Sequence, residues 1–115
     1  MSFMNGVKHT HNLMIEVNSD TLKNQDILLI KQKLFEKLHK ITYNEKVNCN
    51  NQLFDIQITW EFDRHSQFMF STISPFSDAY VSLVTKHVLK NLKKQIDEEL
   101  HLQNWSFLFF VSKKI

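Results

Sequence analysis

The sequence predicts an α+β protein, a two-layer sandwich whose antiparallel four-stranded sheet carries both helices on one face. Residues 53–62 alternate between apolar and polar side chains, as in a half-buried strand whose side chains point to opposite faces in turn. Segments 19–41 and 77–100 repeat apolar residues every three or four positions, which is the spacing of an amphipathic helix. The expected order is strand, helix, strand, strand, helix, strand, which is the ferredoxin-like βαββαβ order. Another two-layer α+β arrangement of the same elements is the alternative.

The N-terminal part of the chain should supply one strand and one helix. Residues 1–10 are predicted as a flexible lead-in, and a single α+β domain is expected over residues 11–115. A short strand is predicted over residues 12–18. Ser19 is the expected N-cap of the first helix, because its hydroxyl can accept a hydrogen bond from the first helical turn. The apolar side chains of this helix that should face the sheet are Ile27, Ile30, Leu34, Leu38 and Ile41.

A β-hairpin is predicted in the middle of the chain. Residues 42–52 are rich in asparagine and are predicted as an irregular connection. Strand 53–62 is then followed by a polar turn at residues 63–67 and by a second strand-like run at 68–73. The side chains of the first strand that should face the core are Ile56, Ile58 and Trp60.

The C-terminal part should supply the second helix and the last strand. Either Ser74-Pro75 or Ser77-Asp78 can begin a helix that runs to about Leu100, because proline is tolerated in the first helical turn and serine or aspartate can cap it. The side chains expected to point inward are Val81, Val84, Val88, Leu92 and Ile96. Residues 105–112 are apolar on both faces of a strand, which predicts a central or covered position in the sheet.

Composition excludes several classes of site. The chain has 115 residues with one glycine and one proline, so loops that cradle phosphates with glycine are excluded. A formal net charge of +2 is too small to indicate nucleic-acid binding by itself. The single cysteine, Cys49, cannot form an intramolecular disulfide, which fits a reducing compartment. No apolar run has the length of a membrane span. We therefore expect a cytoplasmic protein that does not contact a membrane.

No group of residues assembles catalytic or metal-binding chemistry in the sequence. The six histidines lack the spacing of a zinc site and are interpreted as scattered surface residues. Cys49 lies between asparagines, without a cationic neighbour that would favour its thiolate. The triplet at residues 63–65 is interpreted as a charged hairpin turn. We expect a protein that is not an enzyme, with no metal, no cofactor and no catalytic residue.

Nucleic-acid binding is the alternative function. It would use the sheet face left open by the helices, together with the basic helices. Phe68 and Phe70 share one face of their strand, but they are interpreted as sheet-packing residues. The lysines that could follow a phosphate backbone are Lys31, Lys33, Lys37, Lys40, Lys86, Lys90, Lys93 and Lys94. A lysine-rich outer face is also the ordinary surface of a solvated helix.

The favoured function is docking of a protein partner, as in an inhibitor, an immunity protein or an adaptor. The polar side of strand 53–62 should stand on the open sheet face, where hydrogen bonds and charge set specificity. The only arginine follows this strand and suits paired hydrogen bonds to a carboxylate. The candidate binding residues are Asp55, Gln57, Thr59, Glu61 and Arg64. A second copy of the chain, docked through the sheet faces, is a further expected partner.

Overall fold

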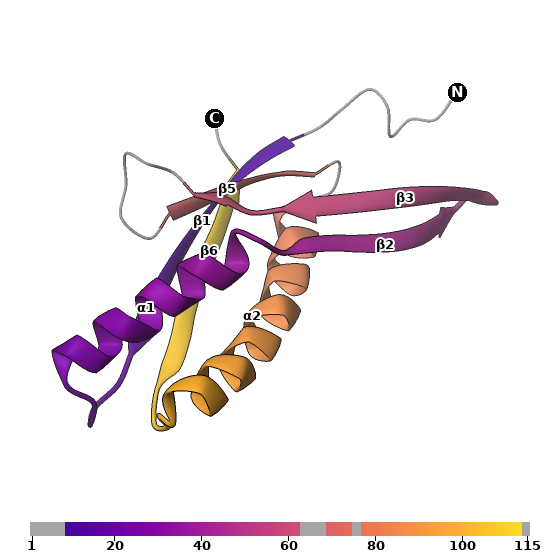
Figure 1. The fold of residues 1–115 in the computed structure, drawn as a ribbon. Helices are drawn as coiled ribbons and strands as arrows, with labels where there is room; N and C mark the ends of the chain where they lie inside the picture. The colour runs from indigo at the N-terminus through magenta and orange to yellow at the C-terminus, as the bar shows by residue number, and fades with distance from the viewer. Residues whose placement is uncertain (1–8, 63–68, 75–76, 114–115) are drawn as a thin grey trace.

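The computed structural model describes residues 9–62, 69–74 and 77–113 (Figure 1). This part of the chain is a mixed α/β protein with two helices and antiparallel strand pairs. Its elements are β1 (His9–Asn18), α1 (Asn24–Leu38), β2 (Thr42–Cys49), β3 (Gln52–Thr59), β4 (Glu61–Phe62), β5 (Met69–Ser74), α2 (Asp78–Leu100) and β6 (Ser106–Lys113). The first two residues of β1 fall in the segment predicted as a lead-in, and residues 1–8 lie outside the described part.

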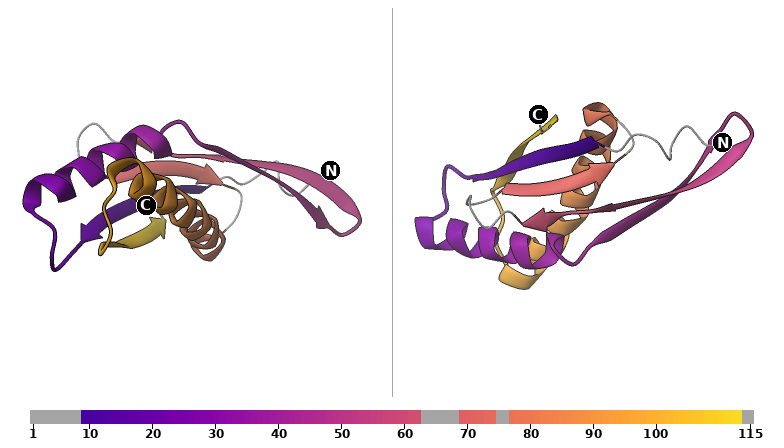
Figure 2. Two further views of the ribbon diagram at one scale, coloured as in Figure 1. Left: turned by 60° about the horizontal axis from the view of Figure 1, so that its bottom comes forward. Right: turned by 90° about the horizontal axis from the view of Figure 1, so that it is seen from above.

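The strands form two sheets. A four-stranded antiparallel sheet has the order β4-β5-β1-β6, so β1 lies between β5 and β6. Both helices pack on one face of this sheet (Figure 2). β2 and β3 form a separate two-stranded sheet that projects past the body as an arm (Figures 1 and 2). The arm makes the molecule elongated, with principal extents of 53 × 28 × 21 Å.

The core lies between the helices and the inner face of the four-stranded sheet. Alternate residues of β1 point into it, because successive side chains of a strand face opposite sides. Ile56, Ile58 and Trp60 are buried, as the alternation of strand 53–62 predicts. The Trp60 indole Nε1 donates a hydrogen bond of 3.2 Å to the buried Thr85 Oγ1 of α2. The residue that links β3 of the arm to β4 of the body is therefore a buried tryptophan, Trp60.

The helix boundaries agree with the sequence at α2 and differ at α1. Ser77 caps α2, and its hydroxyl accepts a hydrogen bond from the Tyr80 amide. Ser19 was predicted to cap α1, but that helix begins five residues later, at Asn24. The Ser19 hydroxyl accepts hydrogen bonds from the amides of Thr21 and Leu22, at 3.3 and 3.1 Å. It therefore stabilises a turn that precedes the helix.

The prediction of an irregular connection over residues 42–52 is wrong. This segment contains β2, which pairs with β3 along its whole length, from Thr42 opposite Thr59 to Cys49 opposite Gln52. The two linking residues, Asn50 and Asn51, have φ angles of 51° and 64°. Positive φ at both central residues is what a tight two-residue hairpin turn requires, and asparagine tolerates it. The asparagines therefore mark a turn.

The prediction that the last strand is central or covered is also wrong. β6 pairs only with β1 among the strands described, and it forms one edge of the four-stranded sheet. Its residues Phe107, Phe109 and Val111 pack against the core. Leu108 and Phe110 point to the opposite face and are 51% and 64% exposed. The apolar character of both strand faces thus reflects an exposed apolar surface.

Candidate docking surfaces

The arm has an inner face that packs near α2 and an outer polar face. Tyr43 lies opposite Ile58 and Glu45 lies opposite Ile56, and these four side chains share the inner face. The residues of the outer face alternate with them and are all exposed. They are Thr42, Asn44, Lys46, Asn48, Leu53, Asp55, Gln57 and Thr59, of which only Leu53 is apolar.

Four of the five predicted binding residues lie on one exposed polar row. Asp55, Gln57 and Thr59 stand on the outer face of β3, and Glu61 is exposed on β4. The row reaches the four-stranded sheet, because Thr59 and Glu61 line a small pocket of about 100 Å³ together with residues of β1 and β5. Arg64 lies outside the described residues. Most of the row therefore belongs to the arm, which the sequence did not reveal.

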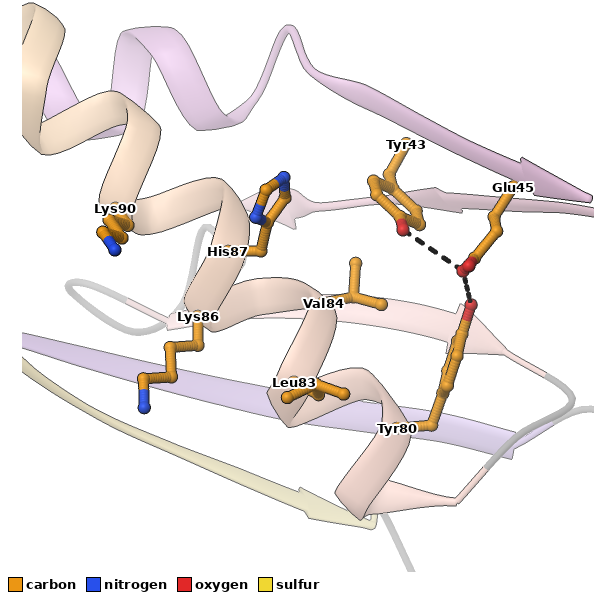
Figure 3. A pocket seen from close by; sticks show the side chains of 8 residues that line it. All are labelled: Tyr43, Glu45, Tyr80, Leu83, Val84, Lys86, His87 and Lys90. Carbon is orange, nitrogen blue, oxygen red and sulfur yellow. Dashed lines mark hydrogen bonds between the residues drawn. The ribbon is translucent and has the colours of Figure 1, made fainter.

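A larger pocket lies between α2 and the base of the arm (Figure 3). It has a volume of about 480 Å³. Three side chains join its two walls: the hydroxyls of Tyr43 and Tyr80 both donate to Oε2 of Glu45, the first at 3.1 Å. Glu45 thus connects β2 to the first turn of α2. The other residues that line the pocket are Leu83, Val84, Lys86, His87 and Lys90.

The tyrosines of this cluster hold their protons more tightly than free tyrosine. Burial, and then the hydrogen bond to Glu45, raise the pKa of Tyr80 above the ordinary value of 10.0. The same causes raise the pKa of Tyr43. Both hydroxyls act as donors to one carboxylate, which is an arrangement that fixes the arm to the body. The sequence missed this cluster, although Tyr43, Glu45 and Val47 carry the period-two spacing of a strand.

We expect the protein to lose stability above about pH 10 because of these tyrosines. A raised pKa in the folded state means that the unfolded chain releases its protons first, so stability is complete below pH 10.0 and falls as the pH rises further. Urea denaturation between about pH 8 and pH 11 should show a shallower loss for Tyr80→Phe than for the unsubstituted protein. Tyr43→Phe combined with Tyr80→Phe removes both tyrosines of the chain and serves as the limiting case. Equal pH slopes for all three proteins would contradict the expectation.

A buried histidine lies beneath the first turn of α2. His11 is 0% exposed, and its Nδ1 lies 2.5 Å from Oδ1 of Asp78. Its other ring nitrogen, Nε2, and the Thr72 hydroxyl are buried and have no hydrogen-bond partner among the described residues. The two residues lie opposite each other on β1 and β5. The interpretation of His11 as a surface histidine is therefore wrong. The ring is enclosed by the protein, and its contact with Asp78 joins β1 to α2.

The basic stripes of the helices are partly neutralised. Lys37 Nζ lies 2.6 Å from Glu99 Oε1, which connects α1 to α2. Lys93 Nζ lies 2.8 Å from Asp97 Oδ2 and also stacks 4.7 Å from the centre of a Trp105 ring. These lysines offer less charge to a phosphate backbone than their spacing in the sequence suggests.

Within the part of the chain that the structure covers, no three histidine, cysteine, aspartate or glutamate side chains gather as a metal site. Neither helix has the length and apolarity needed to cross a membrane. Comparison of the chain with protein-family models, with curated proteins and with solved structures finds no match. The functional proposal therefore rests on the surfaces of this chain.

Proposed function

We propose that this chain is a small non-catalytic binding protein that docks a protein partner with the β2–β3 arm and the polar row along it. The observation that carries this proposal is the projection of the arm from the body (Figure 1). The candidate contact residues are the exposed Asp55, Gln57, Thr59 and Glu61, to which the sequence adds Arg64.

The arm is built to present a surface. A two-stranded hairpin is only marginally stable in water by itself, so it needs a packed anchor or a partner. Its base is anchored by the buried side chains of Ile56 and Ile58 and by the contact of Glu45 with Tyr80. Further out, Gln52 and Leu53 are exposed, and Leu53 is 65% exposed. A partner that covers the outer half would supply the packing that the body does not.

The charge of the arm favours a protein over a nucleic acid. Residues 42–59 contain one lysine and two carboxylates, Glu45 and Asp55. An arm with a single lysine, opposite Asp55, offers little to neutralise phosphates, and nucleic-acid affinity depends on that neutralisation by basic side chains. Exposed amide and hydroxyl groups such as those of Gln57 and Thr59 suit the hydrogen bonds of a protein interface. Binding of nucleic acid by the open sheet face and the basic helices remains the alternative.

Two finer proposals accompany this function. The role is that of an inhibitor, an immunity protein or an adaptor acting in the cytoplasm. The fold is a ferredoxin-like sandwich in which β3 and β4, interrupted at Trp60, together take the place of the second strand. The sheet order β4-β5-β1-β6 supports the second proposal.

Shortening the arm tests the function. Residues 46–55 can be replaced by Asn-Gly, because Glu45 and Ile56 are direct opposites and a two-residue turn can join them. This variant keeps the anchor side chains Tyr43, Ile58 and Trp60. In affinity capture from the native cell extract, proteins bound by the unsubstituted chain should be absent from the shortened variant, with or without nuclease. Capture of the same proteins by both chains would reject the arm as the docking element.

Charge reversal tests the polar row without changing the length of the arm. Asp55→Lys with Glu61→Lys should leave the free energy of unfolding within about 0.5 kcal/mol, because both positions are exposed. Binding of a protein partner should be lost, whereas binding of nucleic acid should strengthen. Reversal of two exposed carboxylates away from the arm, Asp20→Lys with Glu98→Lys, is the matched control. Loss of the partner in this control as well would indicate an effect of net charge alone.

A further inference from the structure

β6 offers a long strand edge that no other described strand covers. It is the last strand in the order β4-β5-β1-β6, and it pairs with β1 without a bulge from Ser106 to Lys113. Natural proteins usually protect such edges with charged residues, proline or bulges, because an exposed regular edge can pair with another strand. Residues 106–112 contain neither charge nor proline. The opposite edge of the sheet differs, since β4 has only two residues.

Residues 106–112 of β6 have the same chemical character when they are read in either direction from Phe109. Ser106 and Ser112 bound this segment, five apolar residues lie between them with Phe109 at the centre, and Lys113 ends the strand outside it. A two-fold axis brings each position of one strand opposite the mirror position of the other, so it requires this kind of symmetry. Two antiparallel copies centred on Phe109 place apolar beside apolar and hydroxyl beside hydroxyl. No charge would be buried between them.

We propose that β6 pairs with β6 of a second copy of this chain, antiparallel and about a two-fold axis at Phe109. The two four-stranded sheets then form one continuous sheet of eight strands. This inference goes beyond the proposed docking function, because β6 and the arm lie on different parts of the molecule (Figure 1).

The exposed apolar side chains of the open sheet face fit this register. Leu108 of one copy lies beside Phe110 of the other, and the reverse pair forms on the other side of the axis. Met14 lies opposite Phe110 on β1 and is 42% exposed, so it extends the apolar row in each copy. Dimerisation therefore buries part of the apolar surface of Leu108, Phe110 and Met14, which is exposed in the single chain. Burial of such apolar area drives association.

The oligomeric state tests the proposal. Sedimentation over a series from about 1 to about 100 μM should show the unsubstituted chain approaching twice its monomer mass. Phe110→Lys should raise the dimer dissociation constant at least about 30-fold, as expected for a side chain at the centre of an interface. Ile73→Lys is the matched control, because Ile73 is 57% exposed on the open face but belongs to β5. It should leave the dimer intact.

A charge-pair rescue tests the register. Leu108→Glu and Phe110→Lys should each weaken the dimer, and a chain that carries both should recover it, because position 108 faces position 110 of the second copy. Circular dichroism of each variant verifies that it is folded. A monomeric unsubstituted chain over the whole concentration series would overturn the proposal. A dimer that neither single substitution weakens, or that the double substitution fails to restore, would also overturn it.

Discussion

Replacing Ile58 with alanine should lower the free energy of unfolding by about 2–5 kcal/mol, the usual range for truncation of a buried aliphatic side chain. Ile58 is 0% exposed and stands where the arm joins the body, opposite Tyr43. Its truncation leaves a cavity in the core and removes part of the anchor that holds the arm. Equilibrium denaturation in urea measures the loss.

Leu53→Ala is the matched control for Ile58→Ala. Leu53 lies on the same strand, β3, but is 65% exposed. Its truncation removes the same number of carbon atoms and should change stability by no more than about 0.5 kcal/mol. Equal losses for the two variants would mean that the inner face of the arm is not anchored in the core.

Replacing Asp78 with alanine should lower the free energy of unfolding by about 2–3 kcal/mol. The substitution leaves Nδ1 of the buried His11 without its partner, and an unpaired buried polar group costs about 1–3 kcal/mol. It also removes a carboxylate from the first turn of α2, where a negative charge interacts favourably with the helix dipole. Thermal and urea denaturation at neutral pH measure the combined loss.

Asp78→Asn separates these two contributions. The amide oxygen of asparagine can still accept a hydrogen bond from His11, while the charge is lost. This variant should therefore retain most of the stability that Asp78→Ala loses. If the two variants are equally destabilised, the charge at the start of α2 matters and the contact with His11 does not.

Local patterns predicted the elements whose signals are unambiguous. The alternation of strand 53–62 identified Ile56, Ile58 and Trp60 as core residues, and they are buried. Ser77 is the N-cap of α2, as expected from its place before an amphipathic run. These predictions depend only on periodicity and on side chains that satisfy the first amides of a helix, so neighbouring residues suffice to make them.

The arm could not be predicted in this way, because two of its signals point elsewhere. Glu45 occupies an inner position of β2 where an apolar residue is expected, and it does so because Tyr43 and Tyr80 hydrogen-bond its carboxylate. In the sequence, the asparagines of residues 42–52 resemble a polar linker. In the structure, Asn50 and Asn51 have positive φ and form a hairpin turn. The polar inner position of β2 is thus explained by Tyr80, a residue of α2 that is distant in sequence.

The candidate surfaces were predicted only in part, because their position also depends on pairing that the local pattern does not show. Polar alternation correctly indicated that Asp55, Gln57, Thr59 and Glu61 are exposed. It could not indicate that most of them stand on a projecting arm, because the pairing of β3 with β2 depends on a turn that was not recognised. Likewise, apolar residues on both faces of β6 are compatible with a covered central strand or with an edge strand that has an exposed apolar face. Only the sheet order distinguishes these cases.

The central place of β1 has a consequence for biosynthesis. Residues 9–18 are synthesised before their sheet partners, which are residues 69–74 and 106–113. β1 therefore stays unpaired until these partners have been translated, and contacts so distant in sequence are slow to form. The β2–β3 hairpin, closed by a two-residue turn, needs only local contacts and can form meanwhile. The arm is thus the part of this molecule whose strand pairing can begin before the sheet forms, and the body then stabilises it.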